Sequence, residues 1–279
     1  IIVSALTTEG ASATFKALAL GALDFVAKPR DAASAHMDEI AADLIAKIKV
    51  ASKTRLKNAV AHAVVERVRP SKPAQRVRRE PSRVVAIGVS TGGPNALQYL
   101  LSQLPGDFPG SILVVQHMPE GFTDMFARRL NESCAIEVKE AQSGDLLIAG
   151  RALVCPGDRH MKVRQMPLAN TVLLTDEGRV NGHRPSVDVL FRSVAAEFGS
   201  QGMGVLMTGM GEDGAEGLGA IKGAGGLTIA QSEESCVVFG MPKAAIERGH
   251  ATRVIPLEML AMTLMNQCSP ERMARVQQV

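Results

Sequence analysis

Strand-like apolar runs alternate with helix-like runs from about residue 83 onward, and this rhythm limits the folds open to the chain. "RVVAIGVS" is a short strand of buried type, and "PNALQYLLSQL" after it has apolar residues at helical spacing. "SILVVQH" and "GFTDMFARRL" repeat the same pair. Strands that alternate with helices pair in parallel, because each helix carries the chain back to the start of the next strand. The pattern predicts an α/β domain built on a mostly parallel sheet.

The predicted domain covers residues 83–267, and its fold class is a doubly wound, Rossmann-like sheet with helices on both faces. Residues 136–182 interrupt the rhythm with short runs separated by turns, which predicts a β-rich insertion. The helical pattern then resumes in "SVDVLFRSVAAEFG". Residues 268–279 are predicted to form a polar tail outside the domain.

Two further strand–helix pairs precede this domain, in residues 1–50. "IIVSAL" and "LDFVAKP" are strand-like, and a helix-like stretch follows each of them. A segment of this length buries little apolar surface by itself. We therefore expect it to be partly unfolded or loosely docked on the larger domain, with uncovered apolar faces.

A basic segment, residues 51–82, joins the two parts. Residues 53–83 contain ten Lys or Arg against two acids, and Pro70, Pro73 and Pro81 interrupt the stretch. This composition is typical of a solvated linker. A nucleic-acid-binding arm is the alternative, but the chain has no Trp and one Tyr to stack on bases. We expect no nucleic-acid partner.

Composition further narrows the classes of protein to which the chain can belong. No apolar run reaches about 18 residues, so we expect no membrane insertion. The start, "IIVSALTTEG", lacks an initiator Met and a basic region, so it reads as the middle of a longer chain and not as a signal peptide. The four cysteines form no C-x-x-C pair and the six histidines are scattered. These features predict a cytoplasmic protein with reduced thiols and no metal site.

Gly88 to Gly92 fit the pattern G-x-S-x-G between a predicted strand and a predicted helix. At such a place glycines permit a sharp turn that lifts the hydroxyl of Ser90 clear of the sheet, where it can act as a nucleophile. Two other interpretations remain open on these residues alone. Ser90 could cap the following helix, or "STGG" could bind an anion through backbone N–H groups.

Two more reactive side chains follow predicted strands. His117 comes directly after "SILVVQ", and Asp213 follows "VLMTGMGE". The carboxyl ends of parallel strands share one edge of a sheet, so we expect both residues to lie near Ser90. A histidine is the usual base for a serine, and a carboxylate can orient the imidazole through its second nitrogen. The three residues predict a Ser-His-Asp triad.

The stretch "GVLMTGMGEDGAEG" permits a different function. Gly209, Gly211 and Gly214 fit the G-x-G-x-x-G of dinucleotide-binding turns, and Glu233 and Glu234 follow at the spacing of a ribose-binding acid. Such a turn normally opens its domain, whereas this one lies well inside it, and its acidic residues would repel a pyrophosphate. We therefore expect no cofactor. The alternatives are a nucleotide- or phosphate-binding regulatory module and a non-catalytic docking module.

Six separated motifs together resemble the chemotaxis protein-glutamate methylesterases, the CheB family. They are "IGVSTGGPNAL", "QHMPEGFTDMFARRLN", "CPGDRHM", "NGHRPSVDVLF", "TGMGEDGAEG" and "SCVVFGMPKAAI". The resemblance implies that Ser90 is the nucleophile, His117 the base and Asp213 the acid that orients it. It also implies an oxyanion hole made by the backbone N–H groups of Thr91 and Met210.

The implied reaction is hydrolysis of glutamate methyl esters on methyl-accepting chemotaxis receptors, with deamidation of receptor glutamines. Two more histidines, His160 and His183, compete with His117 for the role of base. We expect both to line the pocket or to be structural, because neither follows a predicted parallel strand. Arg184 is expected to face either the acidic receptor or solvent.

Residues 1–50 resemble the C-terminal half of a response-regulator receiver domain. Ser4 matches the switch hydroxyl at a strand end, and Lys28 in "GALDFVAKP" matches the phosphate-sensing lysine. The resemblance implies a chemotaxis histidine kinase as a partner and activation of the full-length protein by phosphorylation. The aspartate that would be phosphorylated is not in this chain.

Overall fold

The computed structural model describes residues 1–5, 7–28, 37–52 and 79–269. The predicted linker and tail lie mostly outside these residues. In chain order the helices and strands are β1 (Ile2–Ser4), α1 (Thr8–Ala19), β2 (Phe25–Ala27), α2 (Met37–Ala51), β3 (Val84–Val89), α4 (Gly93–Ser102), β4 (Ser111–Gln116), α5 (Thr123–Ser133), β5 (Glu137–Glu140), β6 (Arg151–Val154), β7 (His160–Met166), β8 (Ala169–Thr175), α6 (Val187–Phe198), β9 (Gly202–Leu206), α7 (Ala215–Gly223), β10 (Leu227–Gln231), α8 (Met241–Glu247), β11 (Arg253–Ile255) and α9 (Leu257–Cys268).

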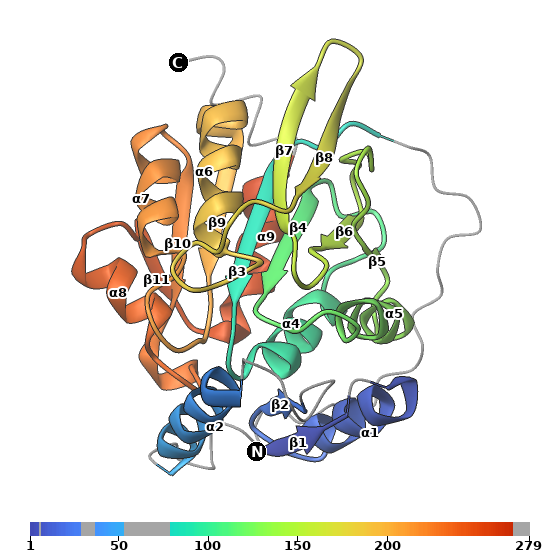
Figure 1. The fold of residues 1–279 in the computed structure, drawn as a ribbon. Helices are drawn as coiled ribbons and strands as arrows, with labels where there is room; N and C mark the ends of the chain where they lie inside the picture. Colours follow the sequence, from blue (N-terminus) through green and yellow to red (C-terminus); the bar gives the residue numbers. More distant parts are fainter. Residues whose placement is uncertain (6, 29–36, 53–78, 270–279) are drawn as a thin grey trace.

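One parallel sheet of seven strands organises the larger part of the molecule, in the order β11-β10-β9-β3-β4-β6-β5. The chain builds outward from β3 through β4 and later returns to the other side of β3 with β9. Helices α4, α5 and α9 cover one face of the sheet, whereas α6, α7 and α8 cover the other (Figure 1). The segments after β3 and β9 therefore leave the sheet toward opposite faces. In α/β folds the crevice formed at such a point, beyond the carboxyl ends of the strands, is where ligands bind.

The central strands are apolar on both sides because both faces of the sheet are covered. Val85, Ile87 and Val89 of β3 belong to the core shared with α4, α5 and α9. Val84 and Ala86 belong to the core shared with α6 and α7. Successive residues of a strand face opposite sides of the sheet, so a doubly covered strand lacks polar alternation. The predicted doubly wound, parallel α/β fold is confirmed.

The segment predicted as a β-rich insertion, residues 136–182, divides into two parts. Strands β5 and β6 pair in parallel and extend the main sheet at its edge. Only β7 and β8 stand apart, as an antiparallel hairpin. The loop between β5 and β6 contains no helix, which is why the sequence rhythm is lost there. Among the helices of the described residues, none is long and apolar enough to cross a membrane.

The described residues between 1 and 28 pack against the carboxyl end of the sheet (Figure 1), so the expectation of a loosely docked segment is wrong for them. The ring of Phe15 stacks on Phe126 of α5, with centroids 5.6 Å apart. The ring of Phe25 lies 4.7 Å from that of Phe122. These rings bury apolar surface that neither part could cover alone, which stabilises the docked arrangement.

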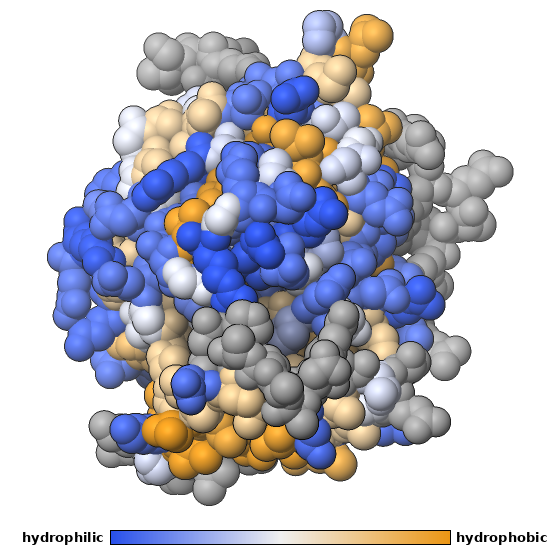
Figure 2. Space-filling view, in the orientation of Figure 1, coloured by the Kyte–Doolittle hydropathy of each residue, from blue (hydrophilic) through white to orange (hydrophobic). Residues whose placement is uncertain are grey.

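The other side of this segment remains apolar and exposed, as expected. Together with α2, its exposed large apolar side chains are Val3, Leu20, Met37, Ile45 and Ile48. Figure 2 shows apolar surface gathered over this part of the molecule, at the bottom of the view, and hydrophilic surface over most of the rest of that face. Contact with the larger domain therefore buries one apolar side of the segment and leaves the other side exposed to solvent.

Candidate active site

Ser90 begins the short turn between β3 and α4. Gly92 in this turn has a φ of 79°, a left-handed conformation that favours glycine, and a Cβ there would lie 2.6 Å from the Cβ of Val237. A Cβ on Gly93 would lie 2.1 Å from Oε1 of Gln116. The tight turn thus depends on both glycines. Gly92 is the N-cap residue of α4 and no side chain caps this helix, so the interpretation of Ser90 as a helix cap is wrong.

His117 lies beside Ser90 at the carboxyl edge of the sheet. Val89 and Gln116, the last residues of β3 and β4, are register partners. The N–H of His117 donates to the carbonyl of Val89 at 3.1 Å. Ser90 and His117 are therefore the next residues beyond a paired strand end, on strands about 4.8 Å apart. This is the proximity that the strand pattern predicted.

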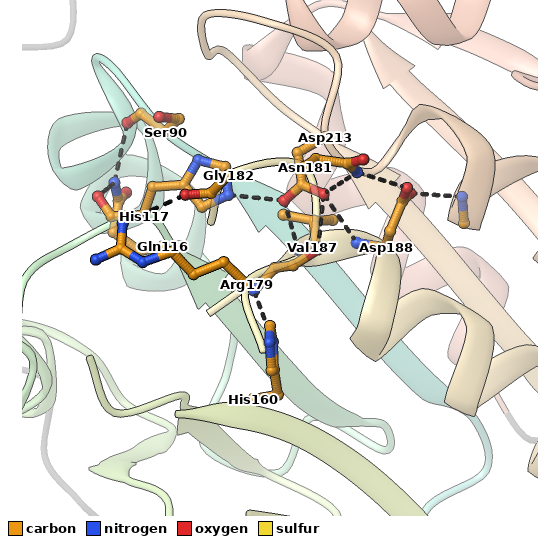
Figure 3. Close-up of polar contacts among 12 residues, drawn as sticks. Ser90, Gln116, His117, His160, Arg179, Asn181, Gly182, Val187, Asp188 and Asp213 are labelled. Carbon is orange, nitrogen blue, oxygen red and sulfur yellow. Dashed lines mark hydrogen bonds and ion pairs between the residues drawn. The ribbon is translucent and has the colours of Figure 1, made fainter. Parts of the chain in front are cut away.

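The two ring nitrogens of His117 have different surroundings. Nε2 lies 2.8 Å from Oδ2 of Asp213 (Figure 3). Nδ1 is buried and has no hydrogen-bond partner in the part of the chain that the structure describes. An ionised carboxylate only accepts hydrogen bonds, so Nε2 carries the hydrogen and Nδ1 of the neutral ring has a free lone pair. The ring is oriented by one nitrogen and able to take a proton on the other.

Asp213 is a buried carboxylate, 1% exposed, with several donors. Besides His117 it accepts hydrogen bonds from Ser186 Oγ at 2.7 Å, the backbone N–H of Val187 at 2.7 Å and Asn181 Nδ2 at 2.9 Å. Burial by itself raises the pKa of this carboxyl. The hydrogen bond and charge of His117, with the bonds from Asn181 and Ser186, outweigh that effect and hold the pKa well below its usual range. Asp213 is therefore ionised at neutral pH.

The two predicted oxyanion donors lie on turns that meet at Ser90. A Cβ on Gly209, next to Met210, would lie 2.8 Å from Cβ of Ser90. The backbone N–H groups of Thr91 and Met210 donate to no acceptor within the described ranges of the chain. A substrate oxygen near Ser90 would thus find N–H groups that the fold has not already used. The oxyanion role of these two residues stays a prediction.

The other two histidines have contacts that differ from those of His117. His160 is fully buried; its Nε2 lies 3.0 Å from the carbonyl of Gly178, and its Nδ1 accepts the N–H of Ser186 at 3.2 Å. It fixes the segment that holds Asp213 and is structural. The ring of His183 stacks on that of His117, with centroids 3.8 Å apart and planes 8° apart. Burial, followed by the nearby charge of His117, lowers the pKa of His183 to about 4.

Arg184 makes several contacts within the protein. Its guanidinium donates to Asp158 Oδ1 at 2.7 and 2.9 Å, and to the carbonyls of Asp176 and Glu177 at 3.0 and 3.2 Å. The side chain is 23% exposed. These bonds tie the segment before α6 to the loop after β6, so Arg184 connects loops around the site.

Sequence reasoning did not identify several residues that hold the site together. They are Gln116, Asn181, Ser186 and Asp188. Gln116 Nε2 donates to the carbonyl of Ser90 at 3.0 Å and so fixes the serine turn. The dipeptide Asn181-Gly182 is a turn signal, and Ser186 directly precedes a predicted helix, so both positions carried a local signal. Nothing local indicated that these residues meet Asp213.

The Gly-rich turn after β9 presents Asp213 to His117, whose Nε2 lies 2.8 Å from Oδ2. Glu234, one of the two predicted ribose acids, accepts a hydrogen bond from its neighbour Ser232 at 2.6 Å. Within the described ranges, no three side chains of His, Cys, Asp or Glu form a group that could hold a metal ion. The Gly-rich turn therefore positions the side chain of Asp213.

Ser4 and Lys28, the predicted receiver residues, lie together on the small β1–β2 sheet. The N–H of Lys28 donates to the carbonyl of Ser4 at 2.7 Å, and Ser4 Oγ donates to the carbonyl of Gly10 at 3.0 Å. Lys28 is exposed. The structure brings these two residues together at adjacent strand ends. Their signalling roles remain predictions.

Comparison with known proteins gives concordant matches. Residues 85–264 match the family model described as CheB methylesterase. A protein of Koribacter versatilis named protein-glutamate methylesterase/protein-glutamine glutaminase 2 is 59% identical over 279 residues, covering 98% of this chain and 77% of the relative. A Pseudomonas aeruginosa protein of the same name is 44% identical over 269 residues, covering 96% and 75%. The crystal structure of the Thermotoga maritima CheB methylesterase catalytic domain is 39% identical, with a TM-score of 0.65, and covers 66% of this chain and 98% of that domain.

Proposed function

The chain belongs to the CheB methylesterase family, and we propose that Ser90, His117 and Asp213 carry out its hydrolytic reaction. The protein is a protein-glutamate methylesterase and protein-glutamine glutaminase, like its named relatives. The observation that carries the assignment is the 2.8 Å contact between His117 Nε2 and Asp213 Oδ2, at the sheet edge where Ser90 begins the next turn.

In the first half of the proposed reaction, Ser90 Oγ attacks the ester carbonyl carbon of a glutamate methyl ester. His117 Nδ1 takes the hydroxyl proton as the new C–O bond forms. Asp213 stabilises the imidazolium that results, through the bond to Nε2. The tetrahedral intermediate then collapses, the bond to the methoxy group breaks, and His117 returns the proton so that methanol leaves. With a glutamine substrate the leaving group is ammonia.

In the second half, water hydrolyses the acyl-serine. His117 Nδ1 removes one proton from the water while its oxygen attacks the acyl carbon. The bond to Ser90 Oγ then breaks and the serine recovers its proton from His117. The products are the glutamate side chain and the free enzyme.

Backbone N–H groups stabilise the negative charge on the carbonyl oxygen in both halves. We assign this role to Thr91 and Met210, which flank Ser90 from the two turns that meet there. Loss of one oxyanion donor costs on the order of 100-fold or more in rate in other hydrolases. The free N–H groups noted above support the assignment.

The substrate that we propose is the methyl-accepting chemotaxis receptor. The relatives' names specify glutamate and glutamine in proteins, and the family resemblance of the six motifs points to chemoreceptors as the proteins concerned. The reaction would take place in the cytoplasm, where these receptors carry their modified side chains. The dinucleotide-binding alternative is not supported, because the Gly-rich turn serves Asp213.

The test is methanol release from methylated receptor by the wild-type chain and by Ser90→Ala. We expect the substitution to lower the rate on the order of 10⁴-fold or more, as removal of a triad nucleophile does elsewhere. Ser102→Ala is the matched control, since Ser102 Oγ donates to the carbonyl of Tyr99 within its own helix α4, at 3.1 Å. Retention of more than about a tenth of the rate in Ser90→Ala would contradict the nucleophile assignment.

We also propose that residues 1–50 are the C-terminal half of a receiver domain, with a chemotaxis histidine kinase as partner. The parallel pairing of β1 and β2, with Ser4 and Lys28 at their ends, supports this. The phosphoacceptor aspartate is then outside residues 1–50. Acetyl phosphate should leave the methylesterase rate of this chain unchanged, and a rise in rate would contradict the assignment.

A further inference from the structure

Residues 180–183 form a tight turn that lies over His117 and Asp213. The N–H of Val180 donates to the carbonyl of His183 at 3.0 Å, and the N–H of His183 donates back at 2.9 Å. Asn181 and Gly182 between them have φ values of 53° and 78°. Two left-handed residues within a doubly bonded pair are typical of a type I′ turn, for which Asn-Gly is a preferred sequence. The turn carries Asn181 to Asp213 and His183 to His117 (Figure 3).

The side-chain amide of Asn181 joins two buried carboxylates. Its Nδ2 donates to Asp213 Oδ1 and to Asp188 Oδ2, both at 2.9 Å. Asp213 and Asp188 are 1% and 2% exposed. The other oxygen of Asp188 accepts the N–H of Gly217 at 2.7 Å, which anchors that carboxylate to the start of α7. A neutral amide with two hydrogens can satisfy two anions without adding a charge.

We propose that Asn181 is a positioning residue that sets the plane of the Asp213 carboxylate so that Oδ2 faces His117. The bond from Asn181 and the bond from Ser186 both fall on Oδ1. Together they hold Oδ1 in place and so restrict rotation of the carboxylate about the Cβ–Cγ bond. This restriction fixes the position of the other oxygen, Oδ2. This inference rests on the proposed function, because it concerns the acid that orients the base.

The requirements of the turn do not explain this contact. Glycine and aspartate also adopt left-handed conformations, so a turn residue at position 181 could be any of the three. Only asparagine also offers two amide hydrogens to two carboxylates. Glycine would leave Asp213 Oδ1 with one donor fewer, and aspartate would place a third carboxylate between two others.

The effect on the reaction passes through His117. The charged or titratable groups around that ring are Asp213, the stacked His183, and Arg179 and Asp188 beyond them. Of these, only Asp213 contacts a ring nitrogen, so it determines how strongly the imidazolium is stabilised. Without Asn181 the carboxylate keeps its bonds from Ser186 and Val187 but is held less firmly, so it orients the ring less well and stabilises its charged form less.

The decisive experiment compares wild type with Asn181→Gly and Asn181→Asp in the intact chain. Both substitutions keep the turn. We expect kcat for methanol release to fall roughly 10- to 100-fold in each, with KM changed less than about twofold, as befits loss of a hydrogen bond to a charged group. In Asn181→Gly the acidic limb of the kcat/KM profile should move to lower pH. An NMR titration of the His117 ring without substrate should show the same displacement.

The control is Asn131→Ala, which removes a side-chain amide whose Oδ1 accepts the N–H of Val138 at 3.0 Å, away from the site. It should leave the pH profile in place. Rates within about twofold of wild type in both Asn181 variants, with an unmoved acidic limb, would overturn the proposal. Failure of the proposed function looks different: Ser90→Ala would then match wild type, whatever the Asn181 variants do.

Discussion

His183 should make the free energy of unfolding depend on pH, and His183→Phe should remove that dependence. Burial against His117 lowers the pKa of His183 from 6.5 to about 4. The unfolded chain then binds the His183 proton more tightly than the folded protein does, so falling pH favours unfolding. The stability associated with neutral His183 is fully present above about pH 6.5 and is lost progressively as the pH falls toward about 4.

The magnitude follows from the two pKa values. At about pH 5, the histidine of the unfolded chain is almost fully protonated, whereas only about a tenth of the folded molecules carry the proton. Linkage converts this difference into about 2 kcal/mol of stability lost relative to neutral pH. Solvent reaches part of the ring and screens its charge, so we expect about 1 to 2 kcal/mol.

Urea unfolding at about pH 7.5 and about pH 5 provides the measurement. Phe keeps a ring over His117 but cannot titrate. From about pH 7.5 to about pH 5, the free energy of unfolding of wild type should therefore fall by about 1 to 2 kcal/mol more than that of His183→Phe. Titrations that both proteins share, such as that of Asp213, cancel in the comparison. Tyr99→Phe is the control, because it changes an aromatic side chain that does not titrate in this range. A wild-type-to-variant difference that is the same at both pH values would refute the reasoning.

Three further outcomes follow from the site and from the docked segment. Asp213→Asn should lower kcat by up to about 10⁴-fold with little change in KM, because the carboxylate acts on His117 and not on substrate; a KM effect alone would argue against this role. Gly92→Ala should lower the midpoint of thermal unfolding, because it forces a left-handed alanine against the Cβ of Val237, and adding Val237→Gly, which removes that Cβ, should restore part of the loss. Asp24→Ala removes the acceptor of the Thr91 hydroxyl, at 2.8 Å, so the amides of β1, α1 and β2 should exchange faster with deuterium; unchanged exchange would show that this hydrogen bond does not hold the segment.

The residues that follow strands could be predicted from the sequence, because one rule of topology covers them. Ser90, His117 and Asp213 each come after an apolar run, and parallel strands bring their carboxyl ends to one edge. No contact had to be known in advance for that inference. The fold class followed in the same way, from the alternation of strand and helix patterns.

Contacts between distant, irregular segments could not be predicted, because no local pattern encodes them. The bond from Asn181 to Asp213 spans 32 positions and starts from a turn with no strand or helix of its own. The packing of Phe15 on Phe126 likewise depends on a complementary face far along the chain, which is why residues 1–50 were expected to be partly unfolded or loosely docked. Strands β5 and β6 were read as part of an insertion, since a helix-free loop connects them.

The Gly-rich turn after β9 has a sequence pattern shared by two functions, dinucleotide binding and the presentation of a carboxylate. The group that lies at the nearby helix N-terminus distinguishes them. In dinucleotide-binding folds a phosphate sits at such an end, held by backbone N–H groups and the helix dipole. Here the helix that follows the Gly-rich turn is α7, and the N–H of Gly217 in its first turn donates to the protein's own Asp188 at 2.7 Å. Asp213, which the turn carries, accepts the N–H of Val187 at the start of α6, also at 2.7 Å. A phosphate at either helix start would have to displace one of these two carboxylates. The N-termini of α6 and α7 thus bind carboxylates of the protein itself, and at α6 this carboxylate is Asp213, which lies beside His117.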